Sequence, residues 1–600
     1  MRVKTTTQAS IGDILSNVNK PWIPEDKCQC ATVRKALNEL GGQPTNLPTL
    51  EGHLFFIGRD YEGPNKEALQ VGSNNVPQQT MWDAAKAVES IRVQLPAKIR
   101  PTEGQWQHTS KRVLQPRRRH NNFCTTKDVY QLRKAMKGLV CGPIDKNPHE
   151  LWFACPCLYH KAWKATYAEG KGYEKVFAKK WDARKRQSAR TVLQNTPPKK
   201  EGSQADVMKA WNYLYRSRGW NHMATFDKKG KLNVPYLLFK AKNITDKTVR
   251  EQKWMKARPI APQTKHPMRK LFHLAGKAWS FVASRIDEDE FTIPHSGKVK
   301  EFLEEAEAKL GGGAIAYILK DLVGCFSNMP KESIKTALRE KVQAIQATTG
   351  ATGISVPRKK QMACSLKHLT SRNYTYIPFE ELIDIMDFAL NNTLLVGFDG
   401  QIWRQSEGIP MGDPHSPGMC IITCAAMEKR WMRTWSAEVK SKFIAKRFMD
   451  DLLLIYKDDN TWRPDELLSD VNDNCYTNPL TLEDGKEGTF LETSFQIYGD
   501  RIACWLKNDN VQGEPPKIWR YQHFDSHGSF VQKKALLLAT MKKVDKMASG
   551  ETPRKRSALQ KLAEFARLRY PRKLLWTACT TLGVETRNPT WFRIREEIPW

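Results

Sequence analysis

Two adjacent aspartates constrain this chain more than any other feature. Asp450 and Asp451 stand between two mainly apolar segments, 442–448 and 452–456, which we expect to pair as a β-hairpin. Two carboxylates held so close repel and raise each other's pKa unless a cation compensates. Oxygen ligands of this kind suit hard divalent metal ions. Taken alone, the pair is equally compatible with an ordinary Asp-Asp turn.

A further carboxylate follows a second apolar strand. Residues 316–319 read as a buried strand that leads into Lys320-Asp321, and the aromatic Phe326 comes shortly after. An aspartate at the end of such a strand could form a metal-binding edge, with the ring facing a substrate. The simpler alternative is an aspartate that caps the next turn.

The segment 408–417, Gly-Ile-Pro-Met-Gly-Asp-Pro-His-Ser-Pro, lies between these two acidic sites in the sequence. Its glycines and prolines predict a rigid loop that presents its backbone closely to a partner. The apolar residues 417–431 that follow predict a buried helix. A structural turn accounts for either half of the loop but poorly for the whole.

The overall charge points to a polyanionic partner. The chain has 600 residues, with 96 Lys and Arg against 64 Asp and Glu, which gives a net charge of +32. The basic residues are spread along the chain and interleaved with aromatic ones, a pattern typical of nucleic-acid binding. No apolar run approaches the ~20 residues of a membrane-spanning helix. The first residues lack the apolar core of a signal peptide. We therefore expect a nuclear or cytoplasmic protein, neither secreted nor in a membrane.

Most of the 13 cysteines should be thiols in such a reducing compartment. Cys28 with Cys30, and Cys155 with Cys157, form C-x-C pairs, and two histidines lie near the second pair. Zinc sites more often use a C-x(2–4)-C spacing. Buried structural thiols are the simpler interpretation, and zinc binding stays an open alternative.

The order of Asp321, the loop 408–417 and Asp450-Asp451 resembles motifs A, B and C of reverse transcriptases. Two shorter segments extend the resemblance. Residues 256–260 resemble the fingers segment that contacts the triphosphate, and residues 490–493 resemble the motif E turn beside the primer end.

Within that family, the chain resembles Penelope-like element reverse transcriptases, which are related to telomerase reverse transcriptase, over roughly residues 130–585. The similar segments are Asp145-Lys146-Asn147, Pro410–Pro417, Arg447–Asp451, Tyr521–Lys533 and Tyr570-Pro571. Three features depart from the family pattern. Phe448 stands where Tyr is commoner, and motif E ends in Glu492-Thr493 where Asp or Gly is usual after Phe-Leu. The chain also has no GIY-YIG endonuclease signature.

This resemblance implies an α+β right-hand polymerase with fingers, a palm built on an antiparallel sheet, and a helical thumb. We expect a basic, RNA-binding extension over residues 1–130, and an N-terminal and fingers region over 131–300. The palm with motifs A to E would cover 301–505, and the thumb 506–600.

The implied activity is RNA-directed DNA polymerisation, in a retroelement or a gene derived from one. Asp321 and Asp450 would hold two Mg²⁺ ions about 3.5–4 Å apart, with Asp451 in support, and Mn²⁺ could replace Mg²⁺. The partners would be an RNA template, a DNA primer or RNA–DNA hybrid, and dNTPs. The resemblance implies that Leu322 also contacts the metal, and that the nucleotide is bound by Lys256, Arg258, Met411 and Gly412. It implies that Lys486 donates a proton to the leaving pyrophosphate. It further implies that primer and template are contacted by Phe490, Leu491 and Lys533.

Phe326 bears on sugar choice, because an aromatic ring beneath the sugar would collide with a 2′-hydroxyl and so favour dNTPs. Two alternatives stay open. An RNA-dependent RNA polymerase uses the same palm and metals, although Phe326 argues against it. A catalytically idle nucleic-acid-binding protein derived from a retroelement would not need all three aspartates.

Overall fold

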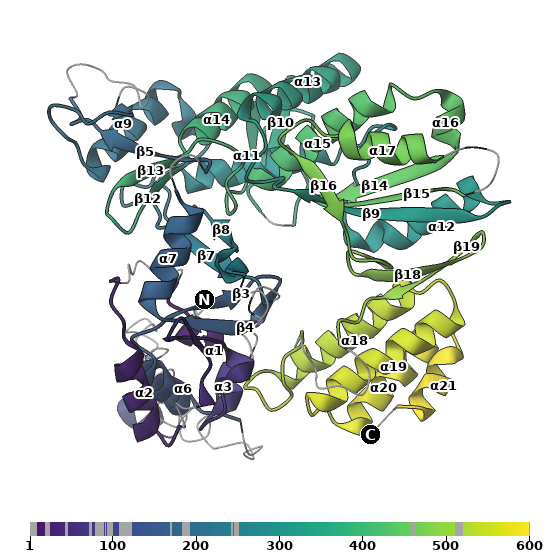
Figure 1. Cartoon of the computed structure of the whole chain (residues 1–600), viewed down its shortest axis with the longest axis horizontal. Coiled ribbons are helices and arrows are strands. Elements are labelled where there is room, and N and C mark those ends of the chain that lie inside the picture. The colour runs from purple at the N-terminus through teal and green to yellow at the C-terminus, as the bar shows by residue number, and fades with distance from the viewer. Residues whose placement is uncertain are drawn as a thin grey trace.

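The computed structural model describes residues 9–18, 25–42, 46–70, 75–78, 100–106, 123–168, 171–182, 192–241, 251–359, 361–458, 464–510 and 520–598, with a few single residues between them. The chain is 44% helix and 20% strand, so the expected α+β class is confirmed. The described residues form four apolar cores, and Figure 1 shows how the helices and strands are arranged.

The N-terminal unit is a four-stranded antiparallel sheet with helices packed against it. Its sheet order is β1-β2-β4-β3. The strands are β1 (Thr49–Leu50), β2 (His53–Ile57), β3 (Val140–Ile144) and β4 (Asn147–Ala154), and the helices are α1 (Ile11–Leu15), α2 (Cys30–Glu39), α3 (Lys66–Gln70), α6 (Thr126–Ala135) and α7 (Pro156–Thr166).

One core joins this sheet to residues on both sides of the expected boundary at residue 130, so that boundary falls inside the unit. The core exists because β2 and β4 are neighbours in the sheet, although many residues separate them in the chain. Within the extension expected to bind RNA, residues 1–130, the segment 109–122 lies outside the described residues.

The central unit has the largest core and the most helices. Its smaller sheets have the order β12-β13-β5-β6 and β10-β11, whereas the pair β7-β8 packs in the core of the N-terminal unit. These strands are β5 (Tyr173–Ala178), β6 (Leu193–Gln194), β7 (Tyr236–Phe239), β8 (Ala257–Ile260), β10 (Gly353–Pro357), β11 (Tyr374–Pro378), β12 (Leu394–Val396) and β13 (Ile402–Gln405). The helices are α9 (Gln204–Ser217), α11 (Arg269–Ala283), α12 (Val299–Leu310), α13 (Lys331–Thr349), α14 (Phe379–Asn391), α15 (Ser416–Met432), α16 (Ala437–Ser441) and α17 (Asp465–Asp473).

A second four-stranded sheet of the central unit carries the acidic residues. Its order is β14-β15-β9-β16, and every neighbouring pair is antiparallel. The strands are β9 (Ile315–Val323), β14 (Phe443–Phe448), β15 (Asp451–Lys457) and β16 (Thr481–Asp484). The expected hairpin of β14 and β15, the strand before Asp321 and the helix α15 are all confirmed.

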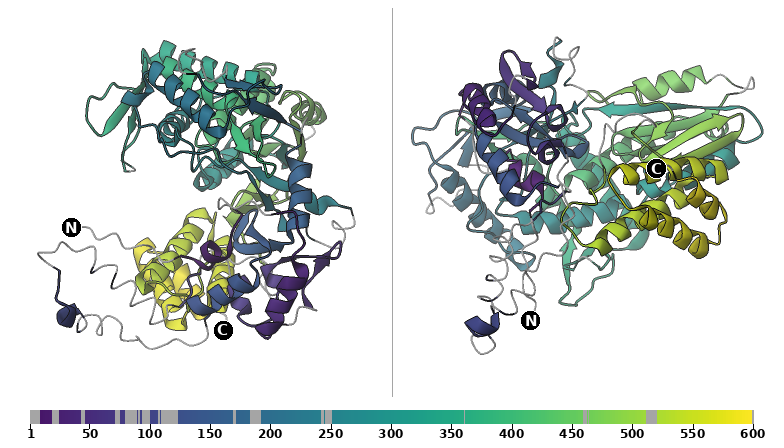
Figure 2. Two further views of the ribbon diagram at one scale, coloured as in Figure 1. Left: turned by 90° about the vertical axis from the view of Figure 1, so that its left-hand side faces the viewer. Right: turned by 90° about the horizontal axis from the view of Figure 1, so that it is seen from below.

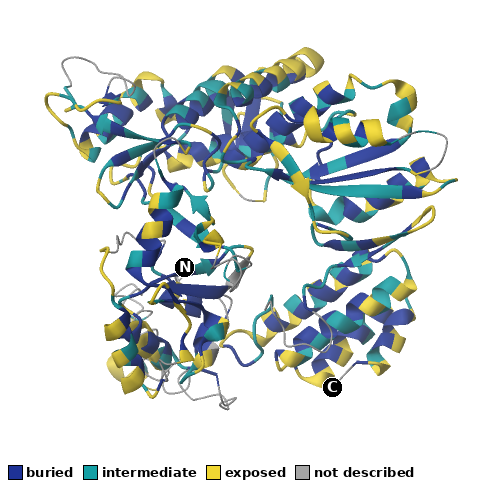
Figure 3. Cartoon of the chain, in the orientation of Figure 1, coloured by how far each residue is buried: buried dark blue, intermediate teal, exposed yellow. Residues whose placement is uncertain are grey.

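Strand β15 is buried on both of its faces. Successive side chains of a strand point to opposite faces. Leu452 and Leu454 lie in the largest core, whereas Leu453 and Ile455 pack with α12 in the core on the other face. Figure 3 shows β15 buried along most of its length beside a half-buried β9. Burial on both faces explains why β15 reads as one unbroken apolar run.

The C-terminal unit begins with a three-stranded meander and ends in a helical bundle with its own core. The elements are β17 (Thr489–Phe490), β18 (Thr493–Tyr498), β19 (Arg501–Leu506), α18 (Phe530–Met547), α19 (Glu551–Arg567), α20 (Arg572–Thr586) and α21 (Thr590–Glu596). Helices α19 and α20 are separate, because Pro571 cannot continue the preceding helix.

The N-terminal and C-terminal units also meet directly, on the side away from the central unit (Figures 1 and 2). The backbone amide of Val76 donates to Ser526 Oγ at 2.8 Å, and the amide of His527 donates to the carbonyl of Val76 at 2.9 Å. The chain therefore closes on itself around its three units. Among the helices in the described part of the chain, none is long and apolar enough to cross a membrane.

Candidate active site

Three carboxylates meet at one end of the sheet β14-β15-β9-β16. Asp321 of β9 lies directly opposite Asp451 of β15. Residues paired in this way project from the same face, with Cβ atoms about 4.5–5.5 Å apart. Asp450 occupies the turn before β15, and its carbonyl accepts a hydrogen bond from the Leu322 amide at 2.7 Å. The hydrogen bond fastens the turn to the strand that carries Asp321.

The turn has an unusual backbone that a buried arginine holds in place. Met449 has a φ of 56°, in the left-handed region that residues other than glycine seldom adopt. Arg447 donates from Nη1 to the Met449 carbonyl at 2.9 Å. The Arg447 side chain is fully buried and forms an ion pair with Glu428 of α15. The strained turn is therefore anchored to the helix that follows the loop 408–417.

Electrostatics at the three carboxylates favour a bound cation. Burial, followed by repulsion from Asp450 and Asp321, raises the pKa of Asp451 to about 6, although Lys146 and Lys507 act in the opposite direction. The donors are all carboxylate oxygens, which is the chemistry that Mg²⁺ and Mn²⁺ prefer. The residues present therefore fit a divalent metal site.

Sequence reasoning missed a fourth carboxylate beside this group. Glu483 of β16 pairs with Asp321 from the side opposite to Asp451, and its side chain is exposed. Its position could not be found from the sequence because β16 is short and mostly polar, so no apolar pattern announces the strand.

The loop 408–417 packs its backbone against the segment that follows β9. Gly408 has a φ of 71°, and a Cβ placed there would lie 2.4 Å from the carbonyl oxygens of Phe326 and Ser327. The amide of Ile409 donates to the Phe326 carbonyl at 2.6 Å. Only glycine fits position 408, so the sequence fixes how closely the loop approaches Phe326.

The other side of this loop meets the segment after β8. The amide of Ala261 donates to the carbonyl of Met411 at 2.8 Å. Gly412 is exposed and has a φ of 120°, and a Cβ there would lie 2.9 Å from the Ala261 carbonyl oxygen. The loop therefore links the neighbourhood of Phe326 to the strand that carries Arg258.

Arg258 and Lys256 stand at or next to this strand. Arg258 Nε lies 3.1 Å from Asp145 Oδ1, and the Arg258 side chain is 31% exposed. The next residue after Asp145 is Lys146, which acts electrostatically on Asp451. Lys256 is exposed. The segment 145–146 thus connects the residues expected to bind a triphosphate with the carboxylates expected to bind metal.

The structure places several other expected site residues differently. The Phe490 side chain lies in a core between β17 and α12. Lys533 is also buried, and its Nζ donates to the carbonyls of Ser526, at 2.6 Å, and Phe524. Both side chains are occupied inside the protein, which corrects the expectation that they contact primer or template.

The remaining expected site residues lie near the same sheet. Leu322 has a buried side chain, so only its backbone is available to a metal. Leu491 is half-buried with a φ of 55°. Lys486 is exposed just beyond β16, where the Gly485 amide donates to the Leu319 carbonyl of β9 at 2.8 Å.

Comparison with known proteins gives loose structural similarity only. No protein-family model matches the chain, and a search of curated protein sequences finds no match. A telomerase from Candida albicans in complex with a TWJ fragment of telomeric RNA aligns with 89% of this chain and 78% of its own, at 11% identity and a TM-score of 0.48.

A telomerase from Candida tropicalis, also in complex with a TWJ fragment of telomeric RNA, aligns with 98% of this chain and 88% of its own, at 12% identity and a TM-score of 0.40. The RNA-dependent RNA polymerase of bacteriophage phi12 covers 74% of this chain and 68% of its own, at 10% identity and a TM-score of 0.24. These values are too low to assign an activity, so the case for function rests on the site itself.

Removing one charge from the acidic cluster should stabilise the metal-free protein. We expect Asp451→Asn to raise Tm in EDTA by about one degree, on the order of 1 kcal/mol, because it removes repulsion between ionised carboxylates. The same variant should lose most of the additional Tm increase that Mg²⁺ or Mn²⁺ gives the wild type. Differential scanning calorimetry with and without metal measures both effects.

Asp458→Asn provides the matched control, since Asp458 is an exposed carboxylate just beyond the far end of β15. It should leave both the EDTA value and the metal response unchanged. Equal responses of the two variants would contradict a metal site at Asp451.

Proposed function

We propose that this chain is an RNA-directed DNA polymerase of the Penelope-like type, from a retroelement or a gene derived from one. The observation that carries the proposal is the convergence of Asp321, Asp450 and Asp451 at one end of an antiparallel sheet. Two-metal nucleotidyl transfer requires such a group of oxygen ligands.

Asp321 and Asp450 would hold two Mg²⁺ ions, with Asp451 and the Leu322 carbonyl in support, and Mn²⁺ could substitute. When bound, such ions lower the pKa of an attacking hydroxyl and neutralise charge on a phosphoryl group and its leaving group. The chain itself positions the ligands, through the pairing of β9 with β15 and the anchored turn at Met449.

The sheet β14-β15-β9-β16 would serve as the palm and the helices α18–α21 as the thumb. Residues 131–300 would supply the fingers. The net charge of +32 supports strong, salt-dependent binding to a nucleic acid. An RNA–DNA hybrid would be held by its backbone and shape rather than by its sequence.

Arg258 and Lys256 would bind the triphosphate of the incoming dNTP. Arg258 contacts Asp145 in this structure, so nucleotide binding would compete with that ion pair. Met411 and Gly412 would contact the nucleotide and the template base from the loop 408–417. Lys486 would donate a proton to the leaving pyrophosphate from its exposed position beyond β16.

Extension of a primer on an RNA template tests this proposal directly. We expect the wild type with Mg²⁺ and dNTPs to extend the primer, and Asp450→Ala to lose at least about a thousandfold in rate, because a ligand of the reacting centre is missing. Asp458→Ala, in the same strand region but away from the cluster, should retain wild-type activity.

Wild-type extension with rNTPs in preference to dNTPs would instead identify an RNA-dependent RNA polymerase. Absence of any extension, with RNA binding intact in both the wild type and Asp450→Ala, would identify a catalytically idle nucleic-acid-binding protein.

Phe326 should set the preference for deoxyribonucleotides. Its carbonyl accepts a hydrogen bond from the Ile409 amide, and its half-buried side chain packs against the largest core. We expect Phe326→Ala to lower the dNTP-to-rNTP selectivity by about tenfold or more, since steric exclusion is lost. Single-nucleotide incorporation kinetics measure the ratio.

Phe326→Tyr keeps the ring and should keep the selectivity. Unchanged selectivity in Phe326→Ala would remove this residue from the proposed role.

A further inference from the structure

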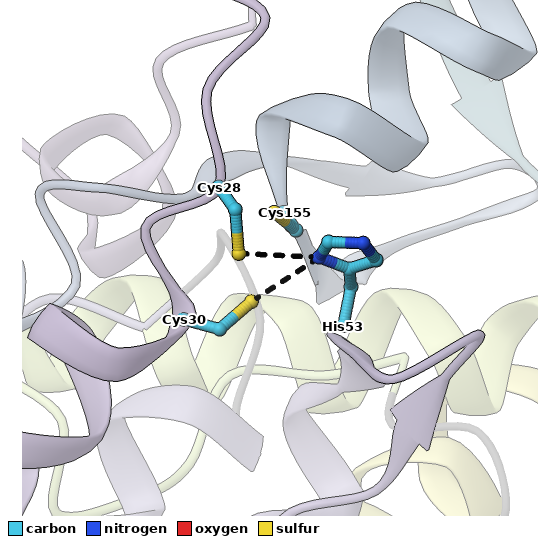
Figure 4. A group of neighbouring side chains, drawn as sticks. All are labelled: Cys28, Cys30, His53 and Cys155. Carbon is cyan, nitrogen blue, oxygen red and sulfur yellow. Dashed lines mark hydrogen bonds between the residues drawn. The ribbon is translucent and has the colours of Figure 1, made fainter.

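Four metal-ligating side chains from distant parts of the N-terminal unit meet at a single point, far in the chain from the acidic cluster. They are Cys28, Cys30, His53 and Cys155, and their ligand atoms all lie within 4.8 Å of one another (Figure 4). Cys28 precedes α2 and Cys30 begins it, His53 begins β2, and Cys155 stands between β4 and α7. Each ligand therefore comes from the end of an element.

The separations match a tetrahedral metal centre. Cys28 Sγ lies 3.2 Å from His53 Nδ1, and Cys30 Sγ lies 3.9 Å from the same nitrogen. Zn–S bonds of about 2.3 Å and Zn–N bonds of about 2.0 Å place tetrahedral ligand atoms roughly 3.5–3.8 Å apart. Small shifts of the side chains, which widen the 3.2 Å separation and shorten the longer ones, would therefore place a zinc ion at the centre of the group.

Two contacts of the cysteines suit sulfurs that bind a metal. The Leu54 amide donates to Cys30 Sγ at 3.1 Å, a hydrogen bond that stabilises a sulfur carrying negative charge. Cys28 is exposed, so apolar burial does not explain its place beside Cys30 and Cys155. The set also contains a histidine whose ring nitrogen faces two of the sulfurs.

We propose that Cys28, Cys30, His53 and Cys155 form a structural zinc site of the Cys₃His type. Four protein ligands complete a tetrahedron and leave no open position, which is the arrangement of structural rather than catalytic zinc. The site joins the start of α2 to β2 and to the junction of β4 and α7. It would hold α2 and the hairpin of β1 and β2 against the rest of the N-terminal unit.

The structure also distinguishes two cysteines that the sequence makes equivalent. Cys155 and Cys157 form one C-x-C pair, but only Cys155 belongs to the four-residue group. Cys157 lies in the first turn of α7 and is half-buried. Cys157→Ser is therefore a matched control for Cys155→Ser.

Metal analysis of the full-length protein, purified without chelators, tests the proposal. We expect about one zinc per chain in the wild type and in Cys157→Ser, and near-complete loss in Cys155→Ser and His53→Ala. Replacing zinc with Co²⁺ should give the visible absorption bands of a tetrahedral thiolate site in the wild type.

His53→Cys guards against loss of zinc through misfolding alone. It supplies a fourth thiolate, so it should retain about one zinc per chain and shift the Co²⁺ bands, whereas His53→Ala should retain neither. The proposal is overturned if the wild type carries no zinc and gives no Co²⁺ bands. Full zinc retention in Cys155→Ser, or equal loss in Cys157→Ser, would also overturn the assigned ligand set.

Discussion

A buried ion pair between Arg447 and Glu428 holds the turn of Met449 and Asp450 in position. Both side chains are fully buried, so each needs the other to compensate its charge. Glu428 also accepts hydrogen bonds from the Tyr476 hydroxyl at 2.8 Å and from the Phe291 amide at 3.1 Å. Removing one partner of such a pair costs about 3–5 kcal/mol.

This network connects every part of the acidic site. Arg447 donates a hydrogen bond to the Met449 carbonyl in the turn. The Asp450 carbonyl of the same turn accepts a hydrogen bond from the amide of Leu322, the residue after Asp321. Glu428 lies in α15, the helix that the loop 408–417 leads into. The carboxylates repel one another, and the buried ion pair and its hydrogen bonds keep them close together despite that repulsion.

Apolar pattern and turn chemistry predicted the elements of the central unit well. The run from Leu452 to Tyr456 predicted β15, and the glycines and prolines of 408–417 predicted the tight loop in which Gly408 has a φ of 71°. Such signals are local, so they survive without knowledge of the fold.

Residues that depend on long-range packing could not be predicted in this way. His53 joins Cys28, Cys30 and Cys155 only because β2 pairs with β4, and nothing in the sequence announces that pairing. From the sequence, Lys533 is expected at the surface, but it is buried and its Nζ donates hydrogen bonds to the carbonyls of Phe524 and Ser526. Phe490 was expected to face nucleic acid, yet the sheet buries it.

The two proposed metal sites differ in chemistry as their ligands require. The acidic cluster offers hard oxygen donors from the half-buried end of two neighbouring strands, which suit an exchangeable Mg²⁺. The Cys₃His group offers softer donors in a closed set, which suit a permanently bound zinc. Each metal would therefore find its own site without competition from the other.

Localised cleavage by Fe²⁺ tests the acidic site most directly. Fe²⁺ replaces Mg²⁺ in oxygen-ligand sites, and with peroxide and ascorbate it cuts the backbone near its ligands. With zinc present, we predict cuts close to Asp321 and Asp450 that excess Mg²⁺ suppresses and Asp450→Ala abolishes. Cuts elsewhere that are insensitive to Mg²⁺, or cuts that persist in Asp450→Ala, would contradict the account.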